Sequence, residues 1–245
     1  MWTDMCLALR IAREAAEVAD RAFAEGVAEV RHKADGSEVT AADLAVEDLV
    51  RQRLAELLPD DGVHGEERPE RRGTSGRRWL VDPISGTADF VHGRPSYSVD
   101  LALEGALAVS VMPSLGITIA AGRGMGCRVF RGRHEEVARV STQDSLDHAR
   151  VCLHGKRKPV LGRGVVVDGS LSVLRLVTGG VDAVIAAGAG LDEFDLACLP
   201  VLVEEAGGRV TAAGDDVVLA SNGPLHDALL GLVARPGVEP GTPGS

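Results

Sequence analysis

Aromatic residues are scarce in this 245-residue chain, making up 3% of it. Lysine is also rare and stands only at positions 33, 156 and 158, so almost every cation is an arginine. The four cysteines are widely separated and include no C-x-x-C pair, which argues against a zinc site or a small disulfide framework. The core must come mainly from Leu, Val and Ala, and the apolar content of 45% is sufficient for one.

Positive charge is in deficit, with 26 Lys and Arg against 36 Asp and Glu and a formal net charge of −10. A nucleic-acid binder needs a basic surface, so we expect no nucleic-acid partner. The acidic excess fits either carboxylates gathered around metal ions or an ordinary soluble surface. No basic start leads into an apolar run, and no apolar stretch is long enough for a bilayer. We therefore expect a cytoplasmic protein without a membrane partner.

Apolar spacing predicts two amphipathic helices at the start of the chain. The first begins after Asp4 as its N-cap. The second begins at Thr40, with Asp43 three residues on, and ends before Pro59. Further helices are predicted over 170–179, 195–206 and 225–233. Strands are predicted over 79–82, 98–103, 107–112, 127–131, 164–168, 181–186 and 217–219. This mixture lacks strict βαβ alternation and predicts a layered α/β fold.

Four segments carry a resemblance to a known family. They are KADGSEVTAAD (33–43), GEE (65–67), WLVDPISGTADF (79–90) and EFDLACLPVLVEEAGGRVT (193–211), and SNGPLHDALL (221–230) also fits. In order and spacing they resemble the inositol monophosphatase superfamily, which includes bacterial histidinol-phosphate phosphatases. The match spans nearly the whole chain. It implies the alternating α and β layers of the sugar phosphatase fold, and a homodimer.

The resemblance implies Mg²⁺ as cofactor and a small phosphorylated metabolite as partner. A phosphate monoester is anionic, so attack by water requires that its charge be neutralised, which Mg²⁺ held by hard oxygen ligands can do. By resemblance, Glu66 and Asp82 bind the first metal together with the main-chain carbonyl of Ile84. Asp82 and Asp195 bind the second metal.

The same resemblance assigns catalytic roles around these ligands. Thr87 orients and activates the water, beside Glu66, and Asp43 lies behind the group. Ser85, Gly86 and Thr87 receive the phosphate at a helix start.

We predict that residues 1–130 form an α+β subdomain with the metal motifs and that residues 131–238 form an α/β subdomain completing the site. Residues 239–245 are predicted to be disordered.

Some of these residues also have ordinary structural roles that the sequence allows. Asp82 ends an apolar strand before a Pro-x-x-Gly turn, where a carboxylate is costly unless it is paired or metal-bound. Asp195 is flanked by Asp192 and Glu193, but the following LACLPVLVEEAGG favours Asp195 as the ligand. Thr40 is expected to cap a helix and not to act in catalysis.

The chain departs from the family pattern at its metal motif, which normally reads D-P-I-D-G-T. Ser85 replaces the second Asp, and a neutral hydroxyl attracts a hard cation far less than a carboxylate does. Gly188 replaces a Glu that holds substrate hydroxyls in inositol phosphatases, and Phe194 replaces a Trp. The stretch 141–169 is shorter than usual.

Two extra carboxylates could return charge to the metals. Asp89 stands at a position usually given to Asn, and Asp100 lies in a strand usually neutral there. The plainer alternatives are a hydrogen-bonded turn residue for Asp89 and an exposed strand position for Asp100.

Three hypotheses for function follow. The leading one is a Mg²⁺-dependent phosphomonoesterase of a small polyol or amino-alcohol phosphate, of the inositol phosphate or histidinol phosphate type, with a weakened second metal site. The second is the same scaffold repurposed for different chemistry in a specialised biosynthetic pathway. The third is a non-catalytic pseudophosphatase.

Overall fold

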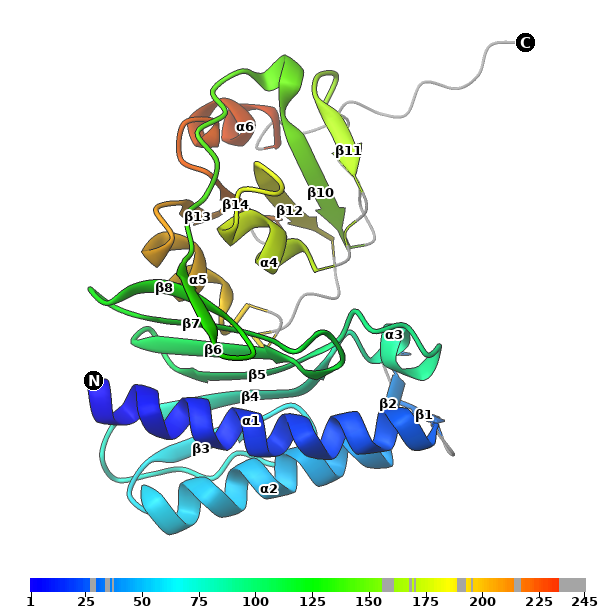
Figure 1. Cartoon of the computed structure of the whole chain (residues 1–245), viewed down its shortest axis with the longest axis vertical. Helices are drawn as coiled ribbons and strands as arrows, with labels where there is room; N and C mark the ends of the chain where they lie inside the picture. Colours follow the sequence, from blue (N-terminus) through cyan, green and yellow to red (C-terminus); the bar gives the residue numbers. More distant parts are fainter. Residues whose placement is uncertain are drawn as a thin grey trace.

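Helices and sheets of the computed structural model stack in alternating layers (Figure 1). The structure describes residues 1–26, 30–33, 36, 38–155, 161–167, 169, 171–188, 193–194, 196–213 and 217–233. From one end to the other, the layers are a helix pair, a large sheet, two short helices, a small sheet and a last helix. The sequence correctly predicted this layered α/β architecture. The expected disorder at 239–245 lies outside the described residues.

The helix pair consists of α1 (Trp2–Glu25) and α2 (Ala41–Leu57). Helix α1 begins three residues earlier than predicted, with Met1 at the N-cap. The carboxylate of Asp4 lies inside the first turn, where it pairs with the N-terminal amino group at 2.9 Å and with Arg77 at 2.7 Å. An acidic side chain in the first turn is favoured by the helix dipole, which explains why Asp4 does not serve as the cap.

Helix α2 begins where the sequence predicted, because Thr40 and Asp43 form a capping box. The Thr40 hydroxyl accepts a hydrogen bond from the Ala42 N–H at 3.1 Å, and Asp43 accepts one from the Thr40 N–H at 2.8 Å. Short strands β1 (Val30–His32) and β2 (Glu38–Thr40) pair just before this helix.

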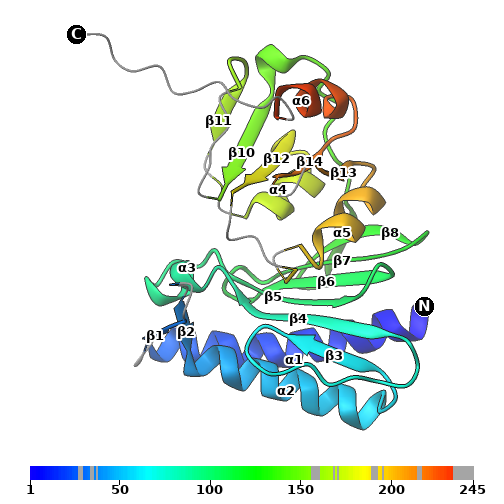
Figure 2. The same cartoon turned by 180° about the vertical axis from the view of Figure 1, so that it is seen from behind.

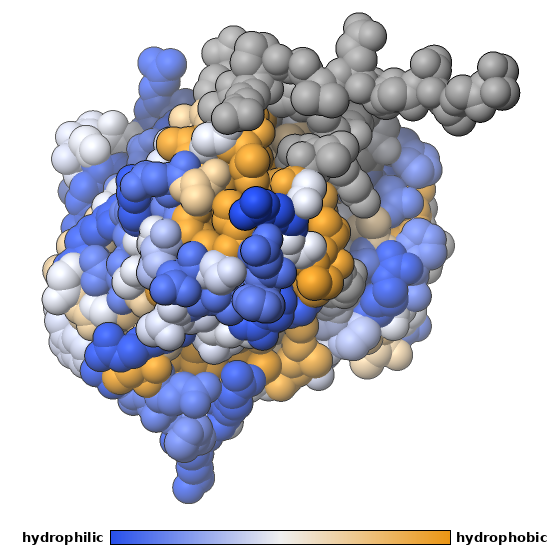
Figure 3. Space-filling view, turned by 90° about the horizontal axis from the view of Figure 1, so that it is seen from above, coloured by the Kyte–Doolittle hydropathy of each residue, from blue (hydrophilic) through white to orange (hydrophobic). Residues whose placement is uncertain are grey.

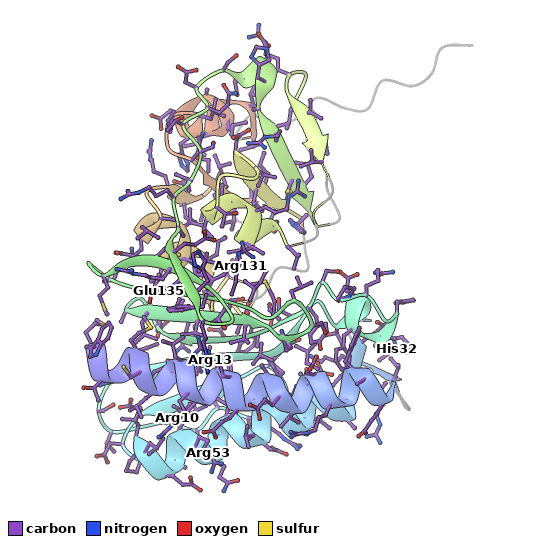
Figure 4. The ribbon with its side chains drawn as sticks, in the orientation of Figure 1. Arg10, Arg13, His32, Arg53, Arg131 and Glu135 are labelled. Atoms are coloured by element: carbon purple, nitrogen blue, oxygen red, sulfur yellow. The ribbon has the colours of Figure 1, made fainter. Side chains whose placement is uncertain are left out.

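The two long helices are tied to each other and to the sheet by arginines (Figure 4). Arg53 of α2 donates to the Glu14 carboxylate of α1 at 2.7 Å. The Arg13 guanidinium of α1 lies 5.3 Å above the ring of Phe130, in a cation–π contact.

Seven strands form the large sheet in the order β3-β4-β5-β6-β7-β8-β9. Strands β3 and β4 are parallel, and the others pair antiparallel. The predicted strands 98–103 and 107–112 are correct to the residue. Strands β3, β7 and β9 were not predicted. The bounds are β3 (Gly62–Gly65), β4 (Arg78–Ser85), β5 (Ser98–Leu103), β6 (Leu107–Met112), β7 (Ile117–Gly122), β8 (Gly126–Arg131) and β9 (His134–Val137).

Strand β4 runs three residues beyond the prediction of 79–82, so Asp82 lies inside the strand and not at its end. The pairing with β5 shifts between Asp82 and Ser85, as at a β-bulge, and resumes at Ser85 opposite Ser98. A bulge accommodates Pro83, which has no N–H to give to the ladder. Helix α3 (Thr87–Val91) follows directly.

Alternation along the strands gives the large sheet two apolar faces. Trp79 and Val81 belong to the core cluster beneath α1 and α2. Leu80 and Ala102 face the other way, into the cluster shared with the small-sheet half of the protein. Asp82 and Asp100 follow in the same alternation and therefore belong to this second face.

The small sheet has the order β11-β10-β12-β14-β13. The helices predicted at 170–179 and 195–206 are shorter than expected, and β10 and β13 were not predicted. Helices α4 and α5 lie between the two sheets, and α6 covers the outer face of the small one (Figures 1 and 2). The bounds are β10 (Arg150–His154), β11 (Val165–Val167), α4 (Ser172–Val177), β12 (Ala183–Ala187), α5 (Leu199–Glu205), β13 (Arg209–Ala212), β14 (Val217–Ser221) and α6 (His226–Val233).

The end of the molecule that carries the small sheet shows apolar areas divided by hydrophilic side chains (Figure 3). Val165 and Val166 of β11 are each 57% exposed. No helix in the described part of the chain is both long and apolar enough to span a bilayer.

A buried carboxylate holds the start of the small sheet. Asp182 is fully buried and accepts hydrogen bonds from the Ser141 hydroxyl at 2.5 Å and the Arg150 N–H at 2.7 Å. Its burial acts to raise the pKa of this carboxyl, but these hydrogen bonds and the Arg150 guanidinium outweigh it and lower the pKa.

We predict that Asp182 stabilises the protein above pH ~4, the ordinary pKa of Asp, and that this contribution is lost as the pH falls through the lower folded-state pKa. The free energy of unfolding, measured in urea, should therefore be lower for Asp182→Asn at pH 7, and the gap should narrow in acid. Asp147→Asn is the control, because Asp147 is 64% exposed and pairs with Arg163 at 3.6 Å. A gap independent of pH would contradict the prediction.

Candidate active site

A cavity of about 530 Å³ lies between the large sheet and the elements above it. Its polar side comes from the ends of β4, β5 and β6 and from α3, which lies at one end of the large sheet (Figure 2). Its opposite wall comes from β10, α4, β12 and α5 and is largely apolar, with His154 and Ser172 among its polar residues. The polar residues include Ser85, Asp89, Ser96, Ser98, Asp100 and Ser110, and the apolar ones include Leu174, Val184, Leu199 and Leu202.

The turn between β4 and α3 opens onto this cavity. Gly86 has φ 85°, the left-handed conformation that glycine adopts without strain. A side chain there would also lie 3.2 Å from the Ser96 carbonyl oxygen. The Thr87 hydroxyl donates to the main-chain carbonyl of Ile84 at 3.0 Å. The turn thus places Ser85 and Gly86 at the cavity, directly beside the hydrogen-bonded Thr87 hydroxyl and Ile84 carbonyl.

Asp82 and Asp100 are direct partners across the β4–β5 pair. Asp82 is 3% exposed, and Asp100 is half-buried and lines the cavity. The Ser110 hydroxyl donates to Asp100 at 2.6 Å from the next strand. Burial, followed by the Asp100 and Asp82 carboxylates, raises the pKa of the Cys198 thiol well above its usual range. Cys198, at the N-cap of α5, lines the same cavity, and its thiol donates to the Val109 carbonyl at 3.7 Å.

Glu66 lies just after β3 and is paired with Lys33. The Lys33 ammonium is 2.6 Å from Glu66 and 2.6 Å from Glu67. Desolvation acts to lower the pKa of Lys33, but the hydrogen bonds to both carboxylates outweigh it and raise the pKa. Burial raises the pKa of Glu67, and Lys33 opposes that shift. Lys33 is the one lysine among the residues that the structure describes.

Asp43 is 1% exposed, and burial raises its pKa. The Thr40 hydroxyl donates to its carboxylate at 2.6 Å, in addition to the capping hydrogen bond. The positive charge of Lys33 opposes this rise in the pKa of Asp43 but does not cancel it. The structure thus shows Asp43 as part of the cap of helix α2, and its place behind the metal ligands stays a prediction.

The segment that leads to Asp195 is held over the large sheet, although Asp195 itself lies outside the described residues. The His64 ring contacts Glu193 through Nε2 at 2.8 Å and packs on Phe194, with ring centroids 4.9 Å apart. Arg78 also reaches Glu193 at 3.3 Å. His64 is opposite Leu80 in the β3–β4 register, two residues before Asp82. The segment before Asp195 therefore approaches the face on which Asp82 lies.

The donors at this site are oxygens, which suit Mg²⁺. Among the described residues, no three His, Cys, Asp or Glu side chains lie close enough together to hold a metal ion. Asp82 and the Ile84 carbonyl lie along one strand, and Glu66 reaches the neighbouring position from the end of β3. The donor chemistry fits a divalent cation, and Lys33 supplies the positive charge beside Glu66.

Two features of the candidate site were not predicted from the sequence. Lys33 is the first residue of the motif at 33–43, but its pairing with Glu66 was not predicted. The rarity of lysine in this arginine-rich chain is the signal that could have indicated it. His64 and Arg78 both contact Glu193, which is more than a hundred residues away in the sequence. No local sequence pattern predicts contacts over such a separation.

The sequence profile of the inositol monophosphatase family matches residues 3–236. The chain belongs to this family. The match takes in every motif described above, from the Lys33 segment to helix α6.

Two similar proteins and one solved structure show the likeness along nearly the whole chain. A histidinol-phosphatase of Mycobacterium tuberculosis is 35% identical over 93% of this chain and 96% of its own length. A Streptomyces griseus protein named glucose-1-phosphate thymidylyltransferase is 37% identical over 99% of this chain and 97% of its own. The solved structure of a Thermotoga maritima IMPase superposes with a TM-score of 0.81 at 26% identity, covering 94% and 96% of the two chains.

Lys33 provides a test of the charge balance beside Glu66. Because Glu67 has a side chain only 6% exposed, we expect Lys33→Met to lower the free energy of unfolding in EDTA by about 1–3 kcal/mol, between the values of exposed and buried pairs. Added Mg²⁺ should recover more stability in this variant than in the wild type.

Thermal and urea unfolding with and without Mg²⁺ would measure both effects. Arg128→Met is the control, because the Arg128–Glu135 pair has side chains 46% and 47% exposed and should contribute little. Equal stability of Lys33→Met and wild type in EDTA would rule out this role for Lys33.

Proposed function

We propose that the protein is a Mg²⁺-dependent phosphomonoesterase acting on a small phosphorylated metabolite, with an amino-alcohol phosphate favoured over a polyol phosphate. The observation that carries the proposal is the hydrogen bond from Thr87 to the Ile84 carbonyl, in the turn that follows Asp82 and opens onto the cavity. It joins the hydroxyl expected to position water to an oxygen expected to bind the metal.

Glu66, Asp82 and the Ile84 carbonyl would hold the first Mg²⁺, and Asp82 with Asp195 the second. The bound ions would neutralise the phosphate charge and lower the pKa of a bound water. Thr87 would hold that water in line with phosphorus through its hydroxyl, whose own proton is directed to Ile84. Gly86 would let the phosphate approach the backbone closely, because it has no side chain to block that approach.

The cavity walls support the choice of substrate. A polyol needs hydrogen-bonding partners around its ring, whereas the wall facing Ser85 and Asp100 is largely apolar. Such a wall suits a substrate with a phosphate at one end and an apolar or aromatic group at the other. The M. tuberculosis relative that is named a histidinol-phosphatase agrees with this choice. We also propose a homodimer, on family resemblance alone, and a cytoplasmic location, which the widely separated free cysteines support.

The second candidate is the same scaffold used for other chemistry. Ser85, at the cavity edge, supplies no negative charge where the family motif has an Asp. The S. griseus relative carries the name of a nucleotidyl transfer enzyme and not of a phosphatase. A non-catalytic phosphate-ester binder is the third candidate.

Phosphate release from a panel that includes histidinol phosphate and inositol 1-phosphate tests the proposal. We expect release that requires Mg²⁺, is abolished by EDTA and is fastest on histidinol phosphate. Absence of Mg²⁺-dependent release from every member would reject the phosphatase and favour the second or third candidate. Faster release from the inositol phosphate would reject the substrate assignment alone.

Thr87 gives a sharper test of the mechanism. Thr87→Ala should lower kcat at least ~100-fold, a typical loss for a group that manages proton transfer. Thr87→Ser keeps the hydroxyl and should retain most of the rate. Comparable losses in both variants would show that the hydroxyl is not what the reaction needs.

A further inference from the structure

Strand β5 places a carboxylate beside Asp82 that the family resemblance assigns no role. Asp100 is the direct antiparallel partner of Asp82. Side chains in such a pair leave the same face of the sheet, with Cβ atoms about 4.5–5.5 Å apart. Leu80 and Ala102, the next partners along the ladder, share that face and belong to the core cluster between the two sheets.

The Asp100 side chain also shares the cavity with Ser85. The two residues reach it from adjacent strands on either side of the bulge: Asp100 is paired with Asp82 before it, and Ser85 is paired with Ser98 after it. Hence the carboxylate that is missing at position 85 is present on the neighbouring strand, at the wall of the same cavity.

Ser110 holds the Asp100 carboxylate in place. It lies opposite Asp100 in the β5–β6 register, is 5% exposed and donates from its hydroxyl at 2.6 Å. Ser110 lines the same cavity as Asp100, so this hydrogen bond holds the carboxylate at the cavity wall.

Two carboxylates facing each other across a strand pair repel, and their burial next to an apolar layer strengthens the repulsion. A divalent cation bound between the two carboxylates would replace this repulsion with attraction of each carboxylate to the cation. Asp89, the other extra carboxylate near the turn, is differently placed. It accepts hydrogen bonds from Arg94 at 2.6 Å and Ser96 at 2.5 Å, which makes it the hydrogen-bonded turn residue of the plainer alternative.

We propose that Asp100 is a ligand of the cation bound at Asp82 and supplies, from β5, the charge that Ser85 does not supply from β4. This rests on the proposed metal-dependent function. It assigns the protein a cation site displaced from the turn onto the sheet, with Ser110 as a positioning residue. Ser85 then faces the substrate side of the cavity as a neutral group.

Cation binding by the full-length protein tests this directly. Mn²⁺ affinity would be measured by electron paramagnetic resonance and Mg²⁺ affinity by calorimetry, both without substrate. Asp100→Asn should weaken the affinity of one bound ion at least ~10-fold, the effect of about 1.4 kcal/mol. The exchange variant Ser85→Asp with Asp100→Ser should restore most of it. Asp89→Asn is the matched control and should bind as the wild type does.

Unfolding in EDTA separates ligand loss from misfolding. Asp100→Asn removes one of two facing charges, so its metal-free melting temperature should equal or exceed that of the wild type. The upward shift on adding Mn²⁺ should be smaller. Wild-type affinity in Asp100→Asn, equal losses in Asp89→Asn, or no Mn²⁺ binding by the wild type would each overturn the proposal. A wild type that binds Mn²⁺ through Asp100 but releases no phosphate would instead reject the phosphatase function.

Discussion

The β4–β5 pairing is the constraint on which the site depends. It fixes Asp82 and Asp100 on one face, at the border between the core shared with α4 and α5 and the open cavity. Buried carboxylates are tolerated only when charge or hydrogen bonds compensate them. The layer architecture therefore brings two carboxyl groups together at the place where we propose that a cation and a phosphate bind.

At the end of β3, the carboxylates are compensated by the ammonium group of a lysine side chain. Lys33 bridges Glu66 and Glu67 at the end of β3, while Glu47 accepts from the Glu67 N–H and pairs with Arg51. These side chains join the helix pair to the large sheet, so the acidic groups are part of the packing between these two layers. If the proposed cation binds Glu66, it would therefore change the ion pairs that connect Glu66, through Lys33 and Glu67, to Glu47 of α2.

Local patterns in the sequence were sufficient for much of this fold and for the family to which the chain belongs. The Thr40–Asp43 cap, the strands 98–103 and 107–112 and the order of the motifs are encoded by neighbouring residues, and they were predicted correctly. The extension of β4 through Pro83 was missed because it depends on a bulge against β5. The partners of Lys33, Glu193 and Asp100 were missed or left open because they depend on strand register and on layers brought together from distant segments.

Register also explains why position 100 is a workable place for a displaced carboxylate. A turn residue such as Ser85 can approach an ion from the open end of the site, whereas a strand residue must already face the correct side of the sheet. Among the neighbours of Asp82 on β5, only alternate positions meet this condition, and Ala102 is committed to the core. Asp100 combines the correct face, access to the cavity and a buried hydroxyl that orients it. The unusual serine in the metal motif and the unusual aspartate in the strand can therefore be understood as one change in the site.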